Sequence, residues 1–162
     1  MMGWALLIVG WMSTLGFVAT GIVGFQFLPQ ETYALHMLLG LSSAFLLLFS
    51  HSWIMFYLIG TGKAIKQAVA EHDLTGDAVQ LTKDFKNISY PWMMLAMGLA
   101  MATFIIGAGV HTRVIPVWVH RSLYFITIAA QLWTLKLEHQ VLRRNRELMI
   151  ELSRRIAAGG ER

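Results

Sequence analysis

The sequence contains no cysteine and few charged residues. Without cysteine the protein has no disulfide, no thiolate nucleophile, no iron–sulfur ligands and no covalently attached haem c. Asp, Glu, Lys and Arg make up 14% of the 162 residues, whereas soluble domains carry charge on about a quarter. This composition excludes a water-soluble enzyme, a disordered chain and a nucleic-acid-binding protein, although the sequence pI is about 9.7.

The few charges are also unevenly distributed. Three stretches hold none of the four charged residue types, namely residues 1–30, 32–62 and 87–112. Each is longer than the roughly 20 apolar residues that cross a bilayer as a helix. Hydrophobic residues make up 56% of the chain, and the mean hydropathy is +0.57. The sequence therefore predicts an integral membrane protein in contact with the lipid bilayer.

The pattern predicts an all-α fold, a four-helix membrane bundle forming a single domain over residues 1–158, with a flexible tail at 159–162. The four expected transmembrane helices cover residues 4–27, 33–59, 91–110 and 117–137. Pro91 suits the first turn of the third span, because its missing N–H would have no partner there. Arg121 interrupts the fourth span near its outer end, where its aliphatic stem lets the guanidinium reach the interface.

The basic residues predict the orientation of these spans. Four spans put both termini on the same side as the 62–90 segment, and 11 of the 13 Lys and Arg residues lie there; only Arg113 and Arg121 lie on the other side. Cytoplasmic loops are enriched in Lys and Arg, so we expect cytoplasmic termini. No basic stretch precedes the first span, which we expect to be retained rather than cleaved as a signal peptide. The expected location is the bacterial inner membrane.

Two cytoplasmic segments extend the expected spans. The 62–90 segment is expected to begin with an amphipathic stretch and to hold a turn and a second short helix between residues 73 and 87. Residues 138–158 are expected to form a charged helix with a narrow apolar seam, because Leu135, Leu142, Met149 and Ile156 recur every seven residues. This seam either packs against the 62–90 segment or docks a partner subunit of a larger membrane complex.

Polar and small residues mark the faces that should point into the bundle. The first span carries Ser13, Gly16, Thr20 and Gly24 at helical spacing, a pattern that lets membrane helices approach closely. In the fourth span, a polar face follows the helical period, and lipid cannot satisfy its hydrogen bonds. That face consists of His120, Thr127, Gln131, Thr134 and Glu138.

Histidines supply the candidate site residues. His36, His111 and His120 come from three different spans and all lie near the outer boundary. His51 lies about ten residues inside the cytoplasmic end of the second span, where an ionisable side chain marks a functional site or a buried hydrogen bond to a neighbouring helix. Counting by depth places Met12 of the first span or Met101 of the third beside His51, with Thr127 and Gln131 flanking it.

Haem b takes one or two axial ligands, commonly His/His or His/Met, between membrane helices. His36 and His51 lie on nearly the same face of one span, with small residues between them, and this arrangement resembles the general pattern of membrane b-type cytochromes. The resemblance implies a haem on His36 with His120 or His111. It leaves His51 for a second haem with Met101, or for a proton or quinone contact.

The expected function is thus a b-type haem electron-transfer subunit that works with a partner complex or the quinone pool. Two alternatives remain. His36, His111 and His120 could bind copper or zinc, since imidazole suits both metals. The protein could instead be an accessory subunit without its own cofactor in a redox, photosynthetic or transport complex. Whether it is an enzyme stays open, although a subunit role is favoured over stand-alone catalysis.

Overall fold

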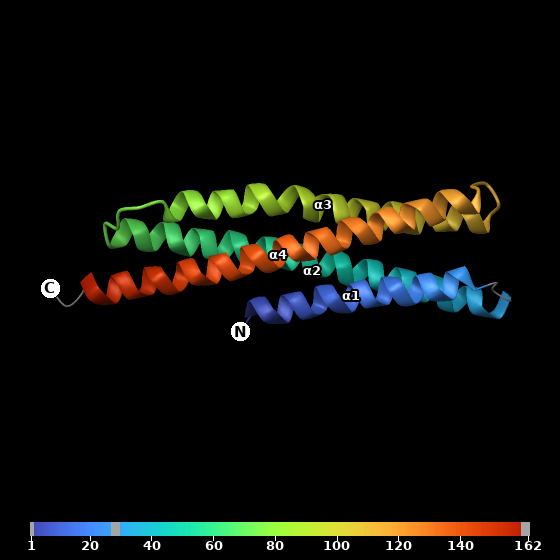
Figure 1. Cartoon of the computed structure of the whole chain (residues 1–162), viewed down its shortest axis with the longest axis horizontal. Helices are drawn as coiled ribbons and strands as arrows, with labels where there is room; N and C mark the ends of the chain where they lie inside the picture. Colours follow the sequence, from blue (N-terminus) through green and yellow to red (C-terminus); the bar gives the residue numbers. More distant parts are fainter. Residues whose placement is uncertain (1, 27–29, 160–162) are drawn as a thin grey trace.

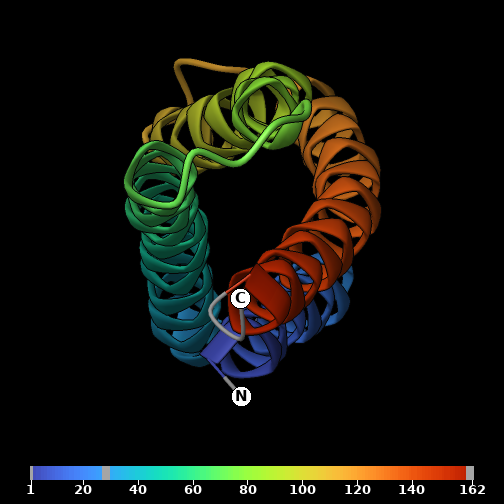
Figure 2. The same ribbon diagram turned by 90° about the vertical axis from the view of Figure 1, so that its left-hand side faces the viewer.

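The computed structural model describes residues 2–26 and 30–159, and every regular element among them is a helix. The four helices are α1 (Met2–Phe25), α2 (Gln30–Glu71), α3 (Ala78–His111) and α4 (Val117–Gly159). They run alternately up and down, as Figure 1 shows. Each helix contacts its neighbours in sequence and α4 closes the ring against α1, which is the arrangement visible end-on in Figure 2. This confirms the all-α four-helix bundle.

The helices differ greatly in length. α2 has 42 residues and α4 has 43, so each is about 63 Å long at 1.5 Å per residue. The hydrocarbon core of a bilayer is only about 30 Å thick. α1 has 24 residues, and Figure 1 shows α2, α3 and α4 continuing well past its first turn. Of the expected extensions, residues 62–71 therefore continue α2, residues 78–90 belong to α3, and residues 138–158 continue α4.

The outer surface of the bundle is apolar. Three helical segments are long and apolar enough to cross a membrane: Ala5–Phe25, Tyr33–Glu71 and Ala78–His111. Large side chains such as Leu15, Phe45, Phe56 and Ile105 are more than half exposed on their outward faces. An apolar surface of this extent is consistent with a membrane protein, in which lipid covers these side chains.

α4 differs from the other three helices. It is not among the segments apolar enough to count as a span, although residues 117–137 were expected to form one. The reason is the number of polar residues in this segment, most of which point inward. Between residues 117 and 133 the exposed positions are apolar except for Arg121 and Ser122, whereas Thr127 and Gln131 are buried. Polar residues on an inward face lower the average hydropathy of a helix without exposing polar groups to lipid.

The third helix is longer than expected. α3 begins at Ala78 and runs through Pro91 to His111, so the expected helix start at Pro91 and the separate short helix are wrong. A proline inside a helix leaves the carbonyl four residues earlier without its N–H partner. Here both Pro91 and Asn87 are exposed.

Residues 72–77 form the turn between α2 and α3, with Gly76 at φ 129°.

The apolar seam of the C-terminal half of α4 packs within the bundle. Val141 and Leu142 are buried in one cluster with Leu58 of α2 and Phe85 of α3. This agrees with the packing interpretation of the seam. Met149 remains partly exposed at 36%. The predicted tail at 159–162 and the predicted end of the first span at Phe27 lie largely outside the described residues.

Candidate functional site

The small residues of α1 face α2, as predicted. Ser13 and Thr20 are buried, and the Ser13 hydroxyl donates to the Ser43 carbonyl at 3.0 Å. Gly16 lies directly against the side chain of Ser43. Close contact between these two helices positions the histidines of α2 relative to the rest of the bundle.

His51 of α2 lies at the centre of a buried polar network that we call the inner centre. Its Nδ1 lies 2.5 Å from Oε1 of Glu138 and its Nε2 lies 2.9 Å from Oε1 of Gln131, both on α4. Gln131 Nε2 in turn donates to the Thr14 hydroxyl of α1 at 3.2 Å, and Thr14 donates to the Gly10 carbonyl. The side chains of His51, Gln131 and Glu138 are at most 1% exposed. The network thus joins three helices in the core.

The bond directions within the inner centre follow from Thr14. Because the Thr14 hydroxyl already donates to Gly10, it accepts from the amide nitrogen of Gln131, and the amide oxygen of Gln131 therefore faces His51. An amide oxygen only accepts hydrogen bonds, so Nε2 of His51 carries a proton. One further proton then lies between Nδ1 of His51 and Oε1 of Glu138.

One atom of the inner centre is unsatisfied. Oε2 of Glu138 is buried and has no hydrogen-bond partner within the described residues. Both ring nitrogens of His51, by contrast, are engaged by oxygen atoms. His51 consequently offers no free nitrogen to a haem iron or another metal in this structure.

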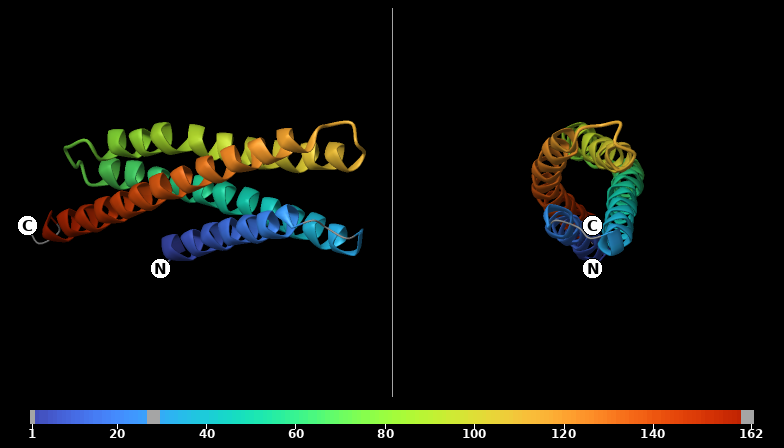
Figure 3. Two further views of the ribbon diagram at one scale, coloured as in Figure 1. Left: turned by 45° about the vertical axis from the view of Figure 1, so that its right-hand side comes forward. Right: turned by 90° about the vertical axis from the view of Figure 1, so that its right-hand side faces the viewer.

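The structure places the predicted methionine partners of His51 elsewhere. Met12 is 56% exposed and Met101 is 41% exposed, so both face outward from the bundle. The partner that sequence reasoning missed is Glu138, which was assigned to the helix beyond the expected span end at Leu137. α4 runs obliquely from α3 towards α1 (Figure 3). Along α2, His51 lies 15 residues after His36, and the same step on α4 from His120 leads to residue 135, between Gln131 and Glu138. A buried acid on the predicted polar face of α4 was the signal that could have found this pair.

A second group, the outer centre, consists of His36 of α2 and His120 of α4. Their ring centroids lie 6.4 Å apart and the ring planes are nearly perpendicular, at 86°. Nδ1 of His36 donates to the Thr20 carbonyl of α1 at 3.0 Å. This bond leaves Nε2 of a neutral His36 with its lone pair. Nδ1 of His120 is buried and lacks a hydrogen-bond partner in the part of the chain that the structure describes.

Two glycines make room for these imidazole rings. A Cβ atom on Gly24 of α1 would lie 2.5 Å from Cε1 of His36, and one on Gly107 of α3 would lie 3.0 Å from Cε1 of His120. Such distances are shorter than carbon–carbon contact allows. All four helices therefore contribute to the outer centre, two through histidines and two through glycines.

His111 does not join the outer centre. It is exposed at the end of α3, and its ring stacks on Tyr33 of α2 with centroids 4.0 Å apart. Across residues 2–26 and 30–159, no three His, Cys, Asp or Glu side chains lie close enough together to hold a metal ion. The expected copper or zinc site of His36, His111 and His120 therefore gains no support from the geometry, and the outer centre is a two-histidine arrangement.

The two rings of the outer centre have centroids 6.4 Å apart. Two imidazoles on opposite sides of one metal, at about 2 Å per metal–nitrogen bond, have centroids about 6 Å apart. No family model, curated protein or solved structure matches this chain. The interpretation of both centres therefore depends on their residues. For the outer centre the relevant features are the separation of the rings, the Nδ1 hydrogen bond of His36 and the unpartnered Nδ1 of His120.

Proposed function

We propose that the protein is a membrane subunit that binds one haem b and transfers electrons between a partner complex and the quinone pool. The observation that carries this proposal is the pairing of His36 and His120 from facing helices, with centroids 6.4 Å apart. Within the described residues neither histidine takes part in an ion pair with an acidic side chain. This distinguishes the outer centre from the inner one.

His36 and His120 would hold the haem iron, and the haem would supply one-electron transfer. The carbonyl of Thr20 accepts a hydrogen bond from Nδ1 of His36, so Nε2 would be the ligand atom. Hydrogen bonds of this kind orient metal-binding imidazoles and raise their basicity. Gly24 and Gly107 keep the space around the rings free of side-chain atoms.

The same proposal includes four transmembrane helices, cytoplasmic termini and a bacterial inner-membrane location. Support for α4 as the fourth span comes from the apolar outward face of residues 117–133 and from its contacts with α1 and α3. Support for the orientation comes from the 11 basic residues on the side of the termini.

Spectroscopy of the purified protein tests the haem proposal. Protein from haem-replete cells is expected to show a Soret band and one haem b per chain by pyridine haemochromogen assay. His36→Ala and His120→Ala should each abolish the stoichiometric haem, while His72→Ala, in the exposed turn after α2, should retain it. A wild-type protein without a Soret band would refute the proposal, and so would unchanged haem content in both variants.

Labelling of single cysteines tests the topology, because the natural chain has none. Cysteine at Gly76, between α2 and α3, should react with a membrane-impermeant maleimide only after the cells are opened. Cysteine at Thr112, between α3 and α4, should react in intact cells whose outer membrane is permeabilised. The reverse pattern would refute cytoplasmic termini, and labelling of both sites from one side would refute four spans.

A further inference from the structure

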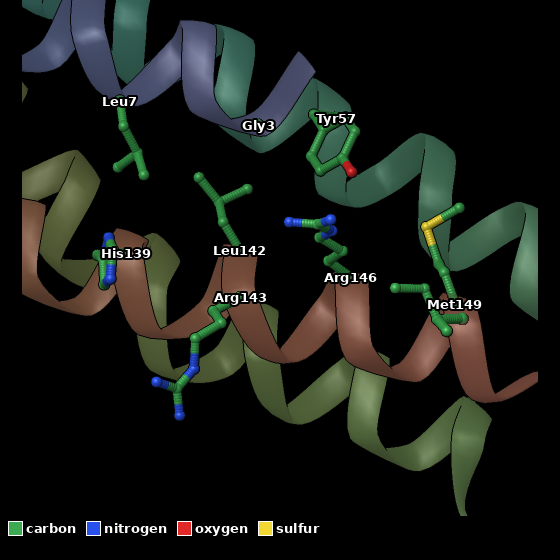
Figure 4. Close-up of a pocket in the computed structure, with 9 residues that line it drawn as sticks. Gly3, Leu7, Tyr57, His139, Leu142, Arg143, Arg146 and Met149 are labelled. Carbon is green, nitrogen blue, oxygen red and sulfur yellow. The ribbon is translucent and has the colours of Figure 1, made fainter. Parts of the chain in front are cut away.

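A cavity of about 260 Å³ lies beside the first turns of α1, between α1, α2 and α4. Its wall is mixed, as Figure 4 shows: Leu7 and Leu142 form an apolar part, and Arg146 and Tyr57 form a polar part. It belongs to neither histidine centre. His36 and Tyr57 are 21 residues apart on α2, which corresponds to about 32 Å along the helix.

The depth of the cavity matches a membrane–water interface. Gly3 of α1 lies against Leu142 of α4 at this level, so the cavity is at the end of the first candidate span. On α2, the predominantly apolar residues before Ile59 give way to Lys63 and Lys66 just beyond it. The headgroups of phospholipids occupy this depth in a bilayer.

The basic residues that line the cavity are His139, Arg143 and Arg146, all on α4. Arg146 points from α4 into the space next to Tyr57, whereas Arg143 points away from it (Figure 4). Arg143 also has an acidic partner, since its Nε lies 3.4 Å from Glu147. Arg146 makes no ion pair with an acidic side chain of the described residues. A guanidinium and a phenol hydroxyl together present several hydrogen-bond donors to an oxyanion.

Apolar surface continues from the cavity along α2. A second hollow, of about 370 Å³, shares Tyr57 and Met149 with the first and is otherwise lined mainly by apolar and aromatic residues, among them Trp53 and Phe56. A ligand with an anionic head and a long apolar tail matches the two adjoining hollows. Inorganic phosphate matches only the first.

We propose that this cavity binds the phosphate of an anionic phospholipid, with Arg146 and Tyr57 as donors and the apolar hollow beside them receiving an acyl chain. A basic group between membrane helices at the cytoplasmic interface is typical of such sites. The proposal depends on the membrane location and not on haem, because the outer centre lies at the other end of the bundle.

Native mass spectrometry of the whole protein in mild detergent tests the proposal, with phosphatidylglycerol and phosphatidylcholine as probes. Phosphatidylglycerol is expected to bind Arg146→Gln about fivefold more weakly than the wild type, as the loss of one interfacial charge implies. The matched control is Arg144→Gln, because Arg144 is exposed on the same helix two residues away. It should bind like the wild type.

Three results would overturn the lipid site. Equal affinity for the two lipids would show that the headgroup charge is not recognised. Equal losses in the two arginine variants would show a diffuse charge effect. Displacement of phosphatidylglycerol by inorganic phosphate at comparable concentration would identify a free-phosphate site instead. Haem content, measured on the same samples, should be unchanged in both variants.

Discussion

The two histidine centres of this bundle use the same side chain in opposite ways. In the inner centre, both ring nitrogens of His51 are bound by oxygen atoms of α4. In the outer centre, His36 is held through Nδ1 alone, and Nδ1 of His120 has no partner in the described residues. Hydrogen bonds within the protein thus use nearly all of the polar side-chain atoms of the inner centre. In the outer centre, nitrogen atoms remain without such a bond.

This contrast shows that burial alone does not identify a ligand-binding histidine. Among His36, His51 and His120, His51 is the most deeply buried. It is nevertheless the one whose two ring nitrogens are both engaged by neighbouring side chains. A histidine binds a metal only through a nitrogen with a free lone pair. The inner centre is therefore interpreted as a structural connection among three helices, and the outer centre as the site for a cofactor.

The largest expected effect comes from separating the inner pair. Glu138→Ala leaves Nδ1 of His51 without its carboxylate partner and should lower the free energy of unfolding by about 3–5 kcal/mol. Unfolding in mixed detergent micelles measures this change. The double variant His51→Ala/Glu138→Ala should lose clearly less than the sum of the single variants. Additive losses, within about 0.5 kcal/mol, would show that the two side chains do not interact.

Filling a glycine position of the outer centre should have an intermediate effect. In Gly24→Ala the new methyl group overlaps the His36 ring, and overpacking of this kind costs about 1–3 kcal/mol. Haem content should fall with stability because His36 must move. Gly98→Ala is the matched control, since no atom lies within 4 Å of the added Cβ. If both variants retained full haem, the contact between α1 and His36 would be unimportant.

A smaller effect is expected from removing the hydrogen bond between Thr127 and Thr103, which lie between the levels of the inner and outer centres. The hydroxyls of Thr127 and Thr103 lie 2.7 Å apart and join α4 to α3. Thr127→Val should cost about 0.6 kcal/mol, the average for such bonds in a membrane protein. Haem content should not change, and Thr112→Val, at the exposed end of α3, should have no measurable effect. A loss as large as that of Glu138→Ala would make Thr127 part of the inner centre.

The smallest effect is expected for an exposed ion pair. Arg155 and Glu151 lie 2.9 Å apart, one helical turn apart, with both side chains at least half exposed. Water and salt weaken such a pair, so Arg155→Gln should change the free energy of unfolding by less than about 0.5 kcal/mol. A cost near that of Glu138→Ala would mean that this segment is covered, for instance by a partner subunit.

Several features of the fold could be predicted from the sequence because they follow from local patterns. The apolar runs identified α1, α2 and α3, and the polar periodicity of residues 127–138 identified the buried face of α4. The uninterrupted α3 could not be predicted, because Pro91 is also typical of a helix start. Only its exposed position beside Asn87 shows how the helix tolerates it.

The candidate site was predicted only in part for a geometric reason. Depth was counted from assumed span ends, and this count brought His36 and His120 together correctly. For His51 it correctly placed Gln131 alongside but missed Glu138, because the assumed end of the fourth span at Leu137 put this residue outside the bundle. The direction of a hydrogen bond, which distinguishes a used from an unused nitrogen, is not encoded in residue spacing.

The connection between His51 and Glu138 has a consequence for biosynthesis. The two residues are 87 positions apart, so at 5–20 residues per second the ribosome makes His51 roughly 4–17 s before Glu138. During that interval Nδ1 of His51 lacks the carboxylate that engages it in the complete chain. α4, which is not apolar enough to count as a span, brings the missing carboxylate only at the end. Arrival of the last helix is thus the step that completes the inner centre, and a chain truncated before α4 would lack both of the oxygen atoms that bind His51.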